Sequence, residues 1–356
     1  MSGNQPPEAR CQLPGARSRP FIIPVFIPHA GCPHQCVFCN QASITASHLR
    51  PAGKDIRHQI ETFLGFRRKH HRYTQIAFFG GNFFGIQNRT VRRLLALATE
   101  YVTAGLADSI RFSTRPDTVD RQRLAKIKAF PVTTIELGVQ SMDNRVLQRS
   151  NRGHSAADTV NAVKLLQEYE YEVGVQMMIG LPGDDARRLQ ASARKIAQLN
   201  PDFIRIYPTV VLAGSPLATL YLKGEYSPLN IDKAVQQVKA LYLYFRKENI
   251  AVIRMGLQAT EGFADAATLL AGPYHPAFGH MVYSEIFFDM AAAQLQALNS
   301  TGQCVRLHVH PRSVSKMRGP KNGNIQKLGE AFHLRKIEIV PDAHLDQDQL
   351  SVAVHP

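Results

Sequence analysis

The stretch His29-Ala30-Gly31-Cys32-Pro33-His34-Gln35-Cys36-Val37-Phe38-Cys39-Asn40 decides both the fold and the chemistry expected of this chain. Its three cysteines have the spacing C-x3-C-x2-C, and they follow an apolar run over 21–28 that predicts a buried strand entering a loop. Three thiolates that converge make a soft metal site with one coordination position open, whereas a closed structural zinc site normally takes four protein ligands. We therefore expect an iron–sulfur cluster with one open iron, and an enzyme.

Other uses of these cysteines stay open from the residues alone. Cys11, Cys304, His29 or His34 would complete a zinc site as a fourth ligand. A disulfide pair with a spare thiol is disfavoured, because the cysteine count is odd, no apolar signal segment opens the chain, and 356 residues bury a core without covalent staples. Redox-sensing thiols usually work in pairs rather than in threes.

The composition is that of a globular protein with an excess of positive charge. Lys and Arg number 42 against 28 Asp and Glu, which gives a net charge of +14. Such an excess favours a polyanionic partner, although a solvated positive face explains many basic proteins. No apolar stretch is long enough to cross a bilayer, and the absence of an export signal together with reactive cysteines predicts a cytoplasmic protein.

From Phe21 onward, short apolar runs alternate with amphipathic helical patterns. Strands are expected over 21–28, 75–79, 109–113, 133–139, 172–179 and 203–210. Helices are expected over 55–70, 88–104, 119–129, 156–170 and 185–199. Repeated strand–helix alternation predicts an α/β fold, a parallel sheet covered by crossover helices, whose functional residues gather at the carboxyl ends of the strands.

Distinctive residues follow the second and third expected strands. Gly80-Gly81 ends one of them, and glycine lets the backbone approach a ligand where a Cβ would collide, although the pair also makes an ordinary turn. Ser113 and Arg115 end the next strand, and Pro116 stops it. Arg115 is a candidate ligand contact, with a simple ion pair to Asp117 as the alternative.

The longest pattern follows the fourth strand, where Gly138-Val139-Gln140-Ser141 is succeeded by Asn151-Arg152-Gly153-His154. Gln140 offers a donor and an acceptor suited to ribose hydroxyls, and Arg152 can fork onto a carboxylate. With the cysteine spacing, these residues resemble the radical S-adenosylmethionine (SAM) superfamily over about residues 15–260. Within it, the chain is similar to the radical SAM domain of the Elongator catalytic subunit and to oxygen-independent coproporphyrinogen oxidases. The run Arg205-Ile206-Tyr207-Pro208-Thr209-Val210 favours the Elongator likeness.

The resemblance implies a partial (β/α)6 TIM-like barrel in which Cys32, Cys36 and Cys39 hold a [4Fe–4S] cluster. SAM would occupy the fourth iron, and its reductive cleavage would form a 5′-deoxyadenosyl radical, with an electron from a reductant such as flavodoxin or ferredoxin. The SAM contacts that the family pattern implies are Gly80, Gly81, Ser113, Arg115, Gln140 and Arg152. The family often has an acidic residue where this chain has Asn82.

The segment after the expected barrel carries half of the charge excess. Residues 301–336 hold eight Lys or Arg and one acidic residue, Glu330. Their expected order of strand, helix, loop, helix and strand has a faint similarity to the KH module, whose glycine-bearing loop clamps nucleotide backbone. In this loop Asn322 replaces the usual second glycine. The phosphate contacts in this interpretation are Lys316, Arg318, Lys321 and Lys327, and the alternative is a basic cap that touches no nucleic acid.

These observations divide the chain into four parts: an N-terminal arm at 1–20, a radical SAM core barrel at 21–260, a connecting helical segment at 261–300, and a basic KH-like α/β extension at 301–345. We expect a radical SAM enzyme whose substrate is an RNA, such as a tRNA. One alternative is a radical reaction on a small molecule or tetrapyrrole. Another is a catalytically silent Fe–S or zinc protein that binds RNA. The identity of the substrate and the oligomeric state do not follow from the sequence.

Overall fold

The computed structural model describes residues 20–27, 31–32, 35–40, 53–67, 73–258 and 267–355. Cys11, His29 and His34, three of the candidate fourth ligands, lie outside the described residues, as does most of the expected N-terminal arm. No helix in the described part of the chain is long and apolar enough to span a membrane.

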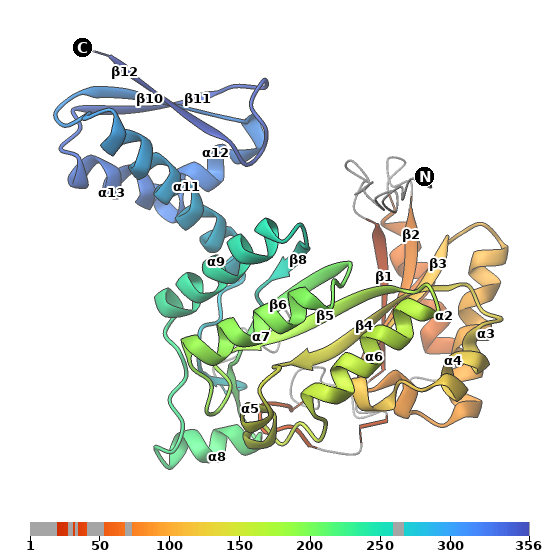
Figure 1. Ribbon diagram of the computed structural model, residues 1–356. Coiled ribbons are helices and arrows are strands. Elements are labelled where there is room, and N and C mark those ends of the chain that lie inside the picture. Colours follow the sequence, from red (N-terminus) through yellow and green to blue (C-terminus); the bar gives the residue numbers. More distant parts are fainter. Residues whose placement is uncertain are drawn as a thin grey trace, which may run out of the picture.

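A seven-stranded parallel sheet forms the body of the molecule and curls into an open half-barrel, as Figure 1 shows. Its strands lie in the order β1-β2-β3-β4-β5-β6-β8, so that each crossover returns the chain to the next position. The expected α/β fold, a partial TIM-like barrel, is confirmed. The strands are β1 (Phe21–Ile27), β2 (Thr74–Gly80), β3 (Ser109–Thr114), β4 (Val132–Gln140), β5 (Glu172–Ile179), β6 (Phe203–Pro208) and β8 (Ala251–Met255).

Crossover helices cover the outer face of this sheet, and their apolar sides face it because that is where they lose contact with water. They are α2 (Gly53–Gly65), α3 (Asn88–Thr103), α4 (Arg121–Ile127), α6 (Ala156–Glu168), α7 (Ala186–Gln198) and α9 (Ile231–Lys247). Two short helices, α5 (Asn144–Arg149) and α8 (Pro216–Leu222), lie at the edge where the strands end.

Successive side chains of each strand point to opposite faces of the sheet. The outer face, under the helices, is apolar, and the inner face carries polar side chains. On β3, Ile110 and Phe112 belong to the apolar core under the helices, whereas Arg111 and Ser113 alternate with them and face the other way. Glu136 of β4 lies on the same inner side, where it pairs with Arg111 and with Arg205 of β6. The Arg205 Nε lies 2.6 Å from Glu136 Oε2. Charged groups therefore line the inside of the barrel.

A smaller C-terminal unit stands apart from the barrel and is joined to it by one long helix, α11 (Phe278–Ala297). Its sheet has the order β11-β10-β12, with β10 (Cys304–Val309) parallel to β11 (Lys336–Pro341) and antiparallel to β12 (Leu350–His355). The helices α12 (Val314–Arg318) and α13 (Gly323–Ala331) cover it. β12 lies beyond the boundary expected at residue 345, so the unit is longer than the sequence predicted.

Candidate cofactor site at the carboxyl ends of the strands

The cysteine loop begins after β1 and is tied to two neighbouring loops through its backbone. The Val37 N–H donates to the Ser150 carbonyl at 3.1 Å, and the Leu217 N–H donates to the Val37 carbonyl at 2.8 Å. The Asn151 side chain donates to the Gln35 carbonyl at 2.8 Å. These bonds hold the loop between α5 and α8, at the edge where the strands end.

The three cysteines differ in their environment. Cys32 is exposed, Cys36 is buried and Cys39 is half-buried, while Cys304 lies in β10 of the C-terminal unit. Within the described residues, no group of three or more His, Cys, Asp or Glu side chains converges to hold a metal ion. Cys32 is exposed as a residue, but its sulfur is partly enclosed by other protein atoms. This burial raises the pKa of the Cys32 thiol, and the positive charge of Arg152 offsets the rise only in part. The assignment of one cluster to these cysteines therefore rests on their spacing and on the chemistry of thiolate ligands.

A close backbone contact fixes the start of the cysteine loop. A Cβ on Gly85 would lie 1.9 Å from the Gly31 carbonyl oxygen, and Gly31 itself has a φ of +77°. Only glycine fits either position, because a side chain would collide in the first case and strain the backbone in the second. Gly31 precedes Cys32 directly, so this contact sets where the first cysteine lies.

Asn82 joins the cysteine loop to the end of β3. Its amide nitrogen donates to the Gly31 carbonyl at 2.9 Å. Its carbonyl oxygen accepts from the Thr114 hydroxyl at 2.7 Å, from the Thr118 hydroxyl at 2.9 Å and from the Arg115 N–H at 3.1 Å. The side chain is fully buried, and both its oxygen and its nitrogen make hydrogen bonds inside the protein. Where the family often has an acidic residue, this chain therefore has a structural amide.

Arg152 lies directly beside the cysteine loop. Its Nη1 is 3.4 Å from the Cys36 sulfur, and its Nη2 donates to the Gly138 carbonyl at 2.5 Å. Its Nε is buried and has no hydrogen-bond partner among the described residues. The side chain expected to bind a SAM carboxylate therefore also contacts the sulfur of one of the three cysteines.

Arg115 makes the ion pair that was the alternative interpretation, and its role as a ligand contact stays a prediction. Its Nε and Nη2 donate to the two oxygens of Asp117 at 2.9 and 3.1 Å, which is the expected ion pair. Its Nη1 is buried and finds no partner within the described part of the chain. Because a buried guanidinium nitrogen left unpaired costs free energy, this donor fits a ligand group that the fold itself does not supply.

His154 is a site residue that the sequence did not single out by itself. The side chain is buried, and neither ring nitrogen has a hydrogen-bond partner among the residues described. Burial, reinforced by the positive charges of Arg152 and Arg115, lowers the pKa of His154 to about 3. The imidazole is therefore neutral at physiological pH. Its place in the Asn-Arg-Gly-His run was visible, but its packing beside two arginines was not.

The remaining expected contacts lie along the same edge of the sheet. Gly80 has a φ of +119°, and a Cβ there would lie 2.5 Å from the Ile27 carbonyl oxygen. Gly81 and Ser113 line one small pocket between the ends of β1, β2 and β3. Gln140 has a φ of 69° and accepts from the Gln176 amide at 3.2 Å. The structure thus brings the predicted residues to one edge of the sheet.

The loop after β5 closes the other side of this edge. The Gly180 carbonyl accepts from the Tyr226 hydroxyl at 2.7 Å, which holds the turn at 180–183. Asp184 follows it, and burial raises the pKa of Asp184 to about 7, with the charges of Asp185 and Asp143 adding to the effect. A carboxyl group whose pKa is raised toward neutral pH therefore follows this turn directly.

Comparison with known proteins assigns the class of this site. The model of the radical SAM superfamily matches residues 26–196, and that of the radical SAM C-terminal domain matches residues 201–287. The chain belongs to the radical SAM superfamily and is an enzyme of that class. Its cofactors are those of the family, a [4Fe–4S] cluster and SAM, and they suit a loop with three cysteines beside arginine donors.

Particular relatives match shorter or longer parts of the chain. An uncharacterized protein of Methanocaldococcus jannaschii is 28% identical over 232 residues, which are 61% of this chain and 70% of that protein. The tRNA uridine(34) acetyltransferase of the same organism is 32% identical over 126 residues, 35% of this chain but only 23% of the relative. The structure of Methanocaldococcus infernus Elp3 has the same fold, with a TM-score of 0.59 and 20% identity over 75% of this chain and 63% of that chain.

Proposed function

We propose that Cys32, Cys36 and Cys39 hold a [4Fe–4S] cluster with which this chain cleaves SAM reductively, and that the substrate of the radical reaction is an RNA. The observation that carries the first part is the cysteine loop itself, which is anchored at the strand ends with the Arg152 guanidinium 3.4 Å from the Cys36 sulfur. When bound, the cluster and SAM supply a 5′-deoxyadenosyl radical that abstracts hydrogen from an unreactive C–H bond.

The chain's own residues bind and orient in this proposal. Gly81 and Ser113 line the same small pocket, where Ser113 offers a hydroxyl, and Gly80 lets the end of β2 pack against the Ile27 carbonyl beside it. The free Nη1 of Arg115 suits the SAM carboxylate, and Gln140 suits the ribose. Arg152 donates to the Cys36 sulfur from 3.4 Å and so helps to orient this cysteine. We infer the reducing cytoplasm as the compartment, because thiolates and a protein reductant persist there.

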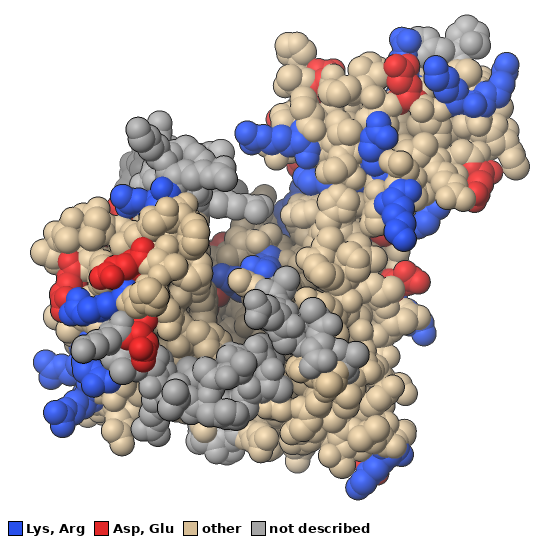
Figure 2. Space-filling model, turned by 180° about the vertical axis from the view of Figure 1, so that it is seen from behind, with Lys and Arg blue, Asp and Glu red and all other residues tan. Residues whose placement is uncertain are grey.

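The RNA part rests on the relatives and on the charge of the C-terminal unit. One group of relatives consists of tRNA uridine(34) acetyltransferases, of which the chain spans about a quarter. Residues 301–355 hold eight Lys or Arg and five Asp or Glu, and Figure 2 shows Lys and Arg side chains spread over the C-terminal unit. We infer that this unit contacts phosphates and that a tRNA is the preferred substrate.

The four expected phosphate contacts are not equally available. Lys316 lies 4.8 Å from the centre of the Tyr283 ring, and Lys327 pairs with Glu285 at 3.1 Å. Arg318 and Lys321 are exposed at the loop between α12 and α13, where Lys321 and Asn322 both have positive φ. Arg318 and Lys321 are therefore the stronger candidates for RNA contact.

The cofactor proposal is tested by anaerobic reconstitution of Cys36→Ala beside Cys304→Ala as the matched control. The wild-type chain and Cys304→Ala should bind about four irons per chain and release 5′-deoxyadenosine from SAM under reduction, as a [4Fe–4S] enzyme does. Cys36→Ala should lose both. SAM cleavage that survives in Cys36→Ala, or a colourless zinc ion in the wild-type chain, would overturn the cluster assignment.

The RNA proposal is tested with Arg318→Glu/Lys321→Glu. The control is a pair of exposed residues on barrel helices, Lys164→Glu/Arg194→Glu, which changes the net charge equally. The loop pair should weaken tRNA binding by roughly tenfold or more and flatten its dependence on salt, because two phosphate contacts are lost. Equal tRNA affinity of both pairs would contradict a role for this loop. SAM cleavage without any affinity of the wild-type chain for RNA would favour a small-molecule substrate.

A further inference from the structure

The first turns of α3 and the length of α4 form a strongly basic surface on the outside of the barrel, called here the α3–α4 basic edge. It consists of Arg89, Arg92, Arg93, Lys126 and Lys128, all of them exposed. None of these five makes an ion pair with another described residue, in contrast to Arg123, which pairs with Asp120. No acidic residue occurs between 82 and 99 or between 121 and 127. Positive charge near the N-terminus of α3 opposes the helix dipole, so local helix stability does not account for it.

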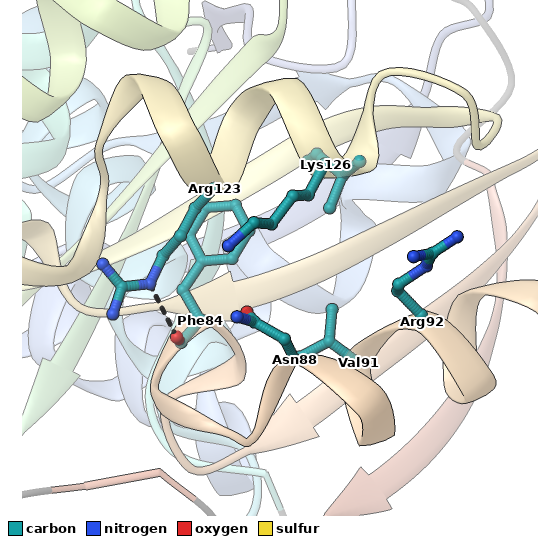
Figure 3. Close-up of a pocket in the computed structure, with 7 residues that line it drawn as sticks. Phe84, Asn88, Val91, Arg92, Arg123 and Lys126 are labelled. Atoms are coloured by element: carbon teal, nitrogen blue, oxygen red, sulfur yellow. Dashed lines mark hydrogen bonds between the residues drawn. The ribbon is translucent and has the colours of Figure 1, made fainter.

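A notch lies within this edge, between α3 and α4. Figure 3 shows Lys126 extending from α4 toward Asn88, with the Phe84 ring beneath and Arg123 beside it. Phe84, Val91 and Ile127 give the notch an apolar lining, while Arg92, Arg123 and Lys126 contribute its cations. It has room for about one water molecule, which suits the tip of a carboxylate side chain rather than a whole small-molecule ligand.

The same edge adjoins the cysteine loop. The Arg123 Nε donates to the Phe84 carbonyl at 3.1 Å, and Phe84 precedes Gly85, whose backbone touches Gly31. Gly31 is bonded to Cys32, and α3 begins three residues after Gly85 at Asn88. By chain length, Cys32 and the first turn of α3 are separated by at most roughly 20 Å. A protein bound on the basic edge is thus close to the first cysteine.

We propose that the α3–α4 basic edge is the docking surface of an acidic one-electron carrier protein that reduces the cluster. The inference rests on the proposed function, because reductive cleavage of SAM requires one electron from outside. The carrier is oxidised by one electron, and that electron breaks the bond between the sulfonium and C5′ of SAM to give methionine and the 5′-deoxyadenosyl radical. Complementary charge on the two proteins steers their encounter and fixes the orientation of the complex.

An acidic protein fits this edge better than single-stranded RNA does. Recognition of unpaired bases relies on aromatic side chains on which the bases stack. The exposed large apolar residues of the described chain include Phe66 and Tyr73, but none of them belongs to α3 or α4. Phe84 is 3% exposed and is therefore no stacking platform. The edge offers exposed positive charge and a notch that fits a carboxylate side chain. Both features suit the surface of an acidic protein.

The test uses the reconstituted full chain with Arg89→Glu/Arg92→Glu and, as the matched control, Lys164→Glu/Arg194→Glu. Glutamate in the first turns of α3 is favourable for the helix, so the variant should fold. Two quantities are measured at low and high salt: the affinity for a reduced flavodoxin, and the rate of 5′-deoxyadenosine release driven either by that flavodoxin or by dithionite. The edge variant should lose at least tenfold in flavodoxin affinity and in flavodoxin-driven rate at low salt, while its dithionite-driven rate stays within twofold of the wild type.

Four outcomes would overturn the inference. Unchanged flavodoxin affinity in the edge variant, an equal loss in the control variant, or an equal loss with dithionite would show that the edge is not the docking surface. The tRNA affinity of both variants is measured as well, and its loss in the edge variant alone, with normal flavodoxin binding, would assign the edge to RNA instead. Because the binding measurement does not require turnover, a wild-type chain that binds flavodoxin at this edge but never cleaves SAM contradicts only the proposed function.

Discussion

Asn82 shows how much a single side chain contributes to this site. Its one amide connects the loop that carries the cysteines with the end of β3, through four hydrogen bonds in a fully buried position. A carboxylate of the same shape accepts the three bonds from Thr114, Thr118 and Arg115. It cannot donate to the Gly31 carbonyl, because an ionised carboxylate has no hydrogen to give. Because the bond to the Gly31 carbonyl needs a donor, this position requires the amide of asparagine rather than a carboxylate.

We predict that Asn82→Asp destabilises the fold and weakens iron binding. An ionised oxygen would face the Gly31 carbonyl, which costs about 2–4 kcal/mol for a buried charge left without its bond. The free energy of unfolding in urea measures the loss, and iron per chain after reconstitution reports the cysteine loop. Asn88→Asp, on the exposed first turn of α3, should be neutral or slightly stabilising. Equal stability of the two variants would contradict the role given to Asn82.

Asp184 gives the chain a pH dependence in a defined window. Because burial raises its pKa from 3.8 to about 7, the folded state holds a proton that the unfolded state has released between these values. The free energy of unfolding therefore falls as pH rises from about 4 to about 7. Asp184→Asn should remove this loss and gain about 1–2 kcal/mol at pH 8, less than the full linkage value because the side chain keeps some contact with water. The free energy of unfolding in urea is measured for the wild type and for Asp184→Asn at pH 5 and pH 8. A difference between the two proteins that is the same at both pH values would refute the raised pKa of Asp184.

At the scale of the element, the loop after β1 and the turn η1 (Phe83–Gly85) behave as one piece, because their backbones touch. We predict that Gly85→Ala displaces the cysteine loop and cuts iron binding by half or more, since the new Cβ would lie 1.9 Å from the Gly31 oxygen. Gly65→Ala is the control, because a Cβ there meets no atom within 4 Å. Iron content and the thermal midpoint are measured for both. Full iron binding by Gly85→Ala would show that the contact is dispensable.

The sequence predicted the elements of the barrel well and the contacts between them poorly. The strands expected over 109–113 and 172–179 appear at Ser109–Thr114 and Glu172–Ile179, because short segments with apolar residues at alternate positions, set between helical patterns, leave few alternatives. The inward charges of Arg111, Glu136 and Arg205 were not foreseen. They come from three separate strands, and no local pattern records which partner a residue meets across a sheet.

The same limit applies to the site. The cysteine triad and the run around Arg152 are local in sequence and could be recognised there. The contact of Gly85 with Gly31 and the burial of His154 depend on segments that meet only in the folded chain. β12 was missed because Leu350 to His355 is a short strand at the end of the chain, and its pairing with β10 is long-range. The roles of the individual site residues remain predictions.

At the scale of the whole molecule, two apolar cores share one helix. Val282 and Ile286 of α11 pack into the barrel core, whereas Phe287 and Leu295 pack into the core of the C-terminal unit. Each unit has its own buried layer, and Met290 packs against both. Local stability can therefore differ between the two units even though the chain passes through them without a break.

We predict that Leu307→Ala destabilises the C-terminal unit alone. Leu307 is fully buried in β10, so its truncation should cost about 2–4 kcal/mol there. Hydrogen exchange should quicken in β10, β11, β12 and α13 while β2 to β5 of the barrel keep their protection. SAM cleavage should persist, whereas tRNA affinity should fall. Uniform loss of protection across the whole chain would show that the two cores unfold as one.

The way in which the two units share α11 limits which part of a bound polynucleotide can reach the barrel. Twenty residues at 1.5 Å per residue make a helix of about 30 Å, but the two units do not attach at its opposite ends. The basic loop packs on the first turns of α11, since Lys316 lies over the Tyr283 ring and Lys327 pairs with Glu285. A polynucleotide held by that loop would therefore start beside the barrel, and only nucleotides close to the grip would reach its interior.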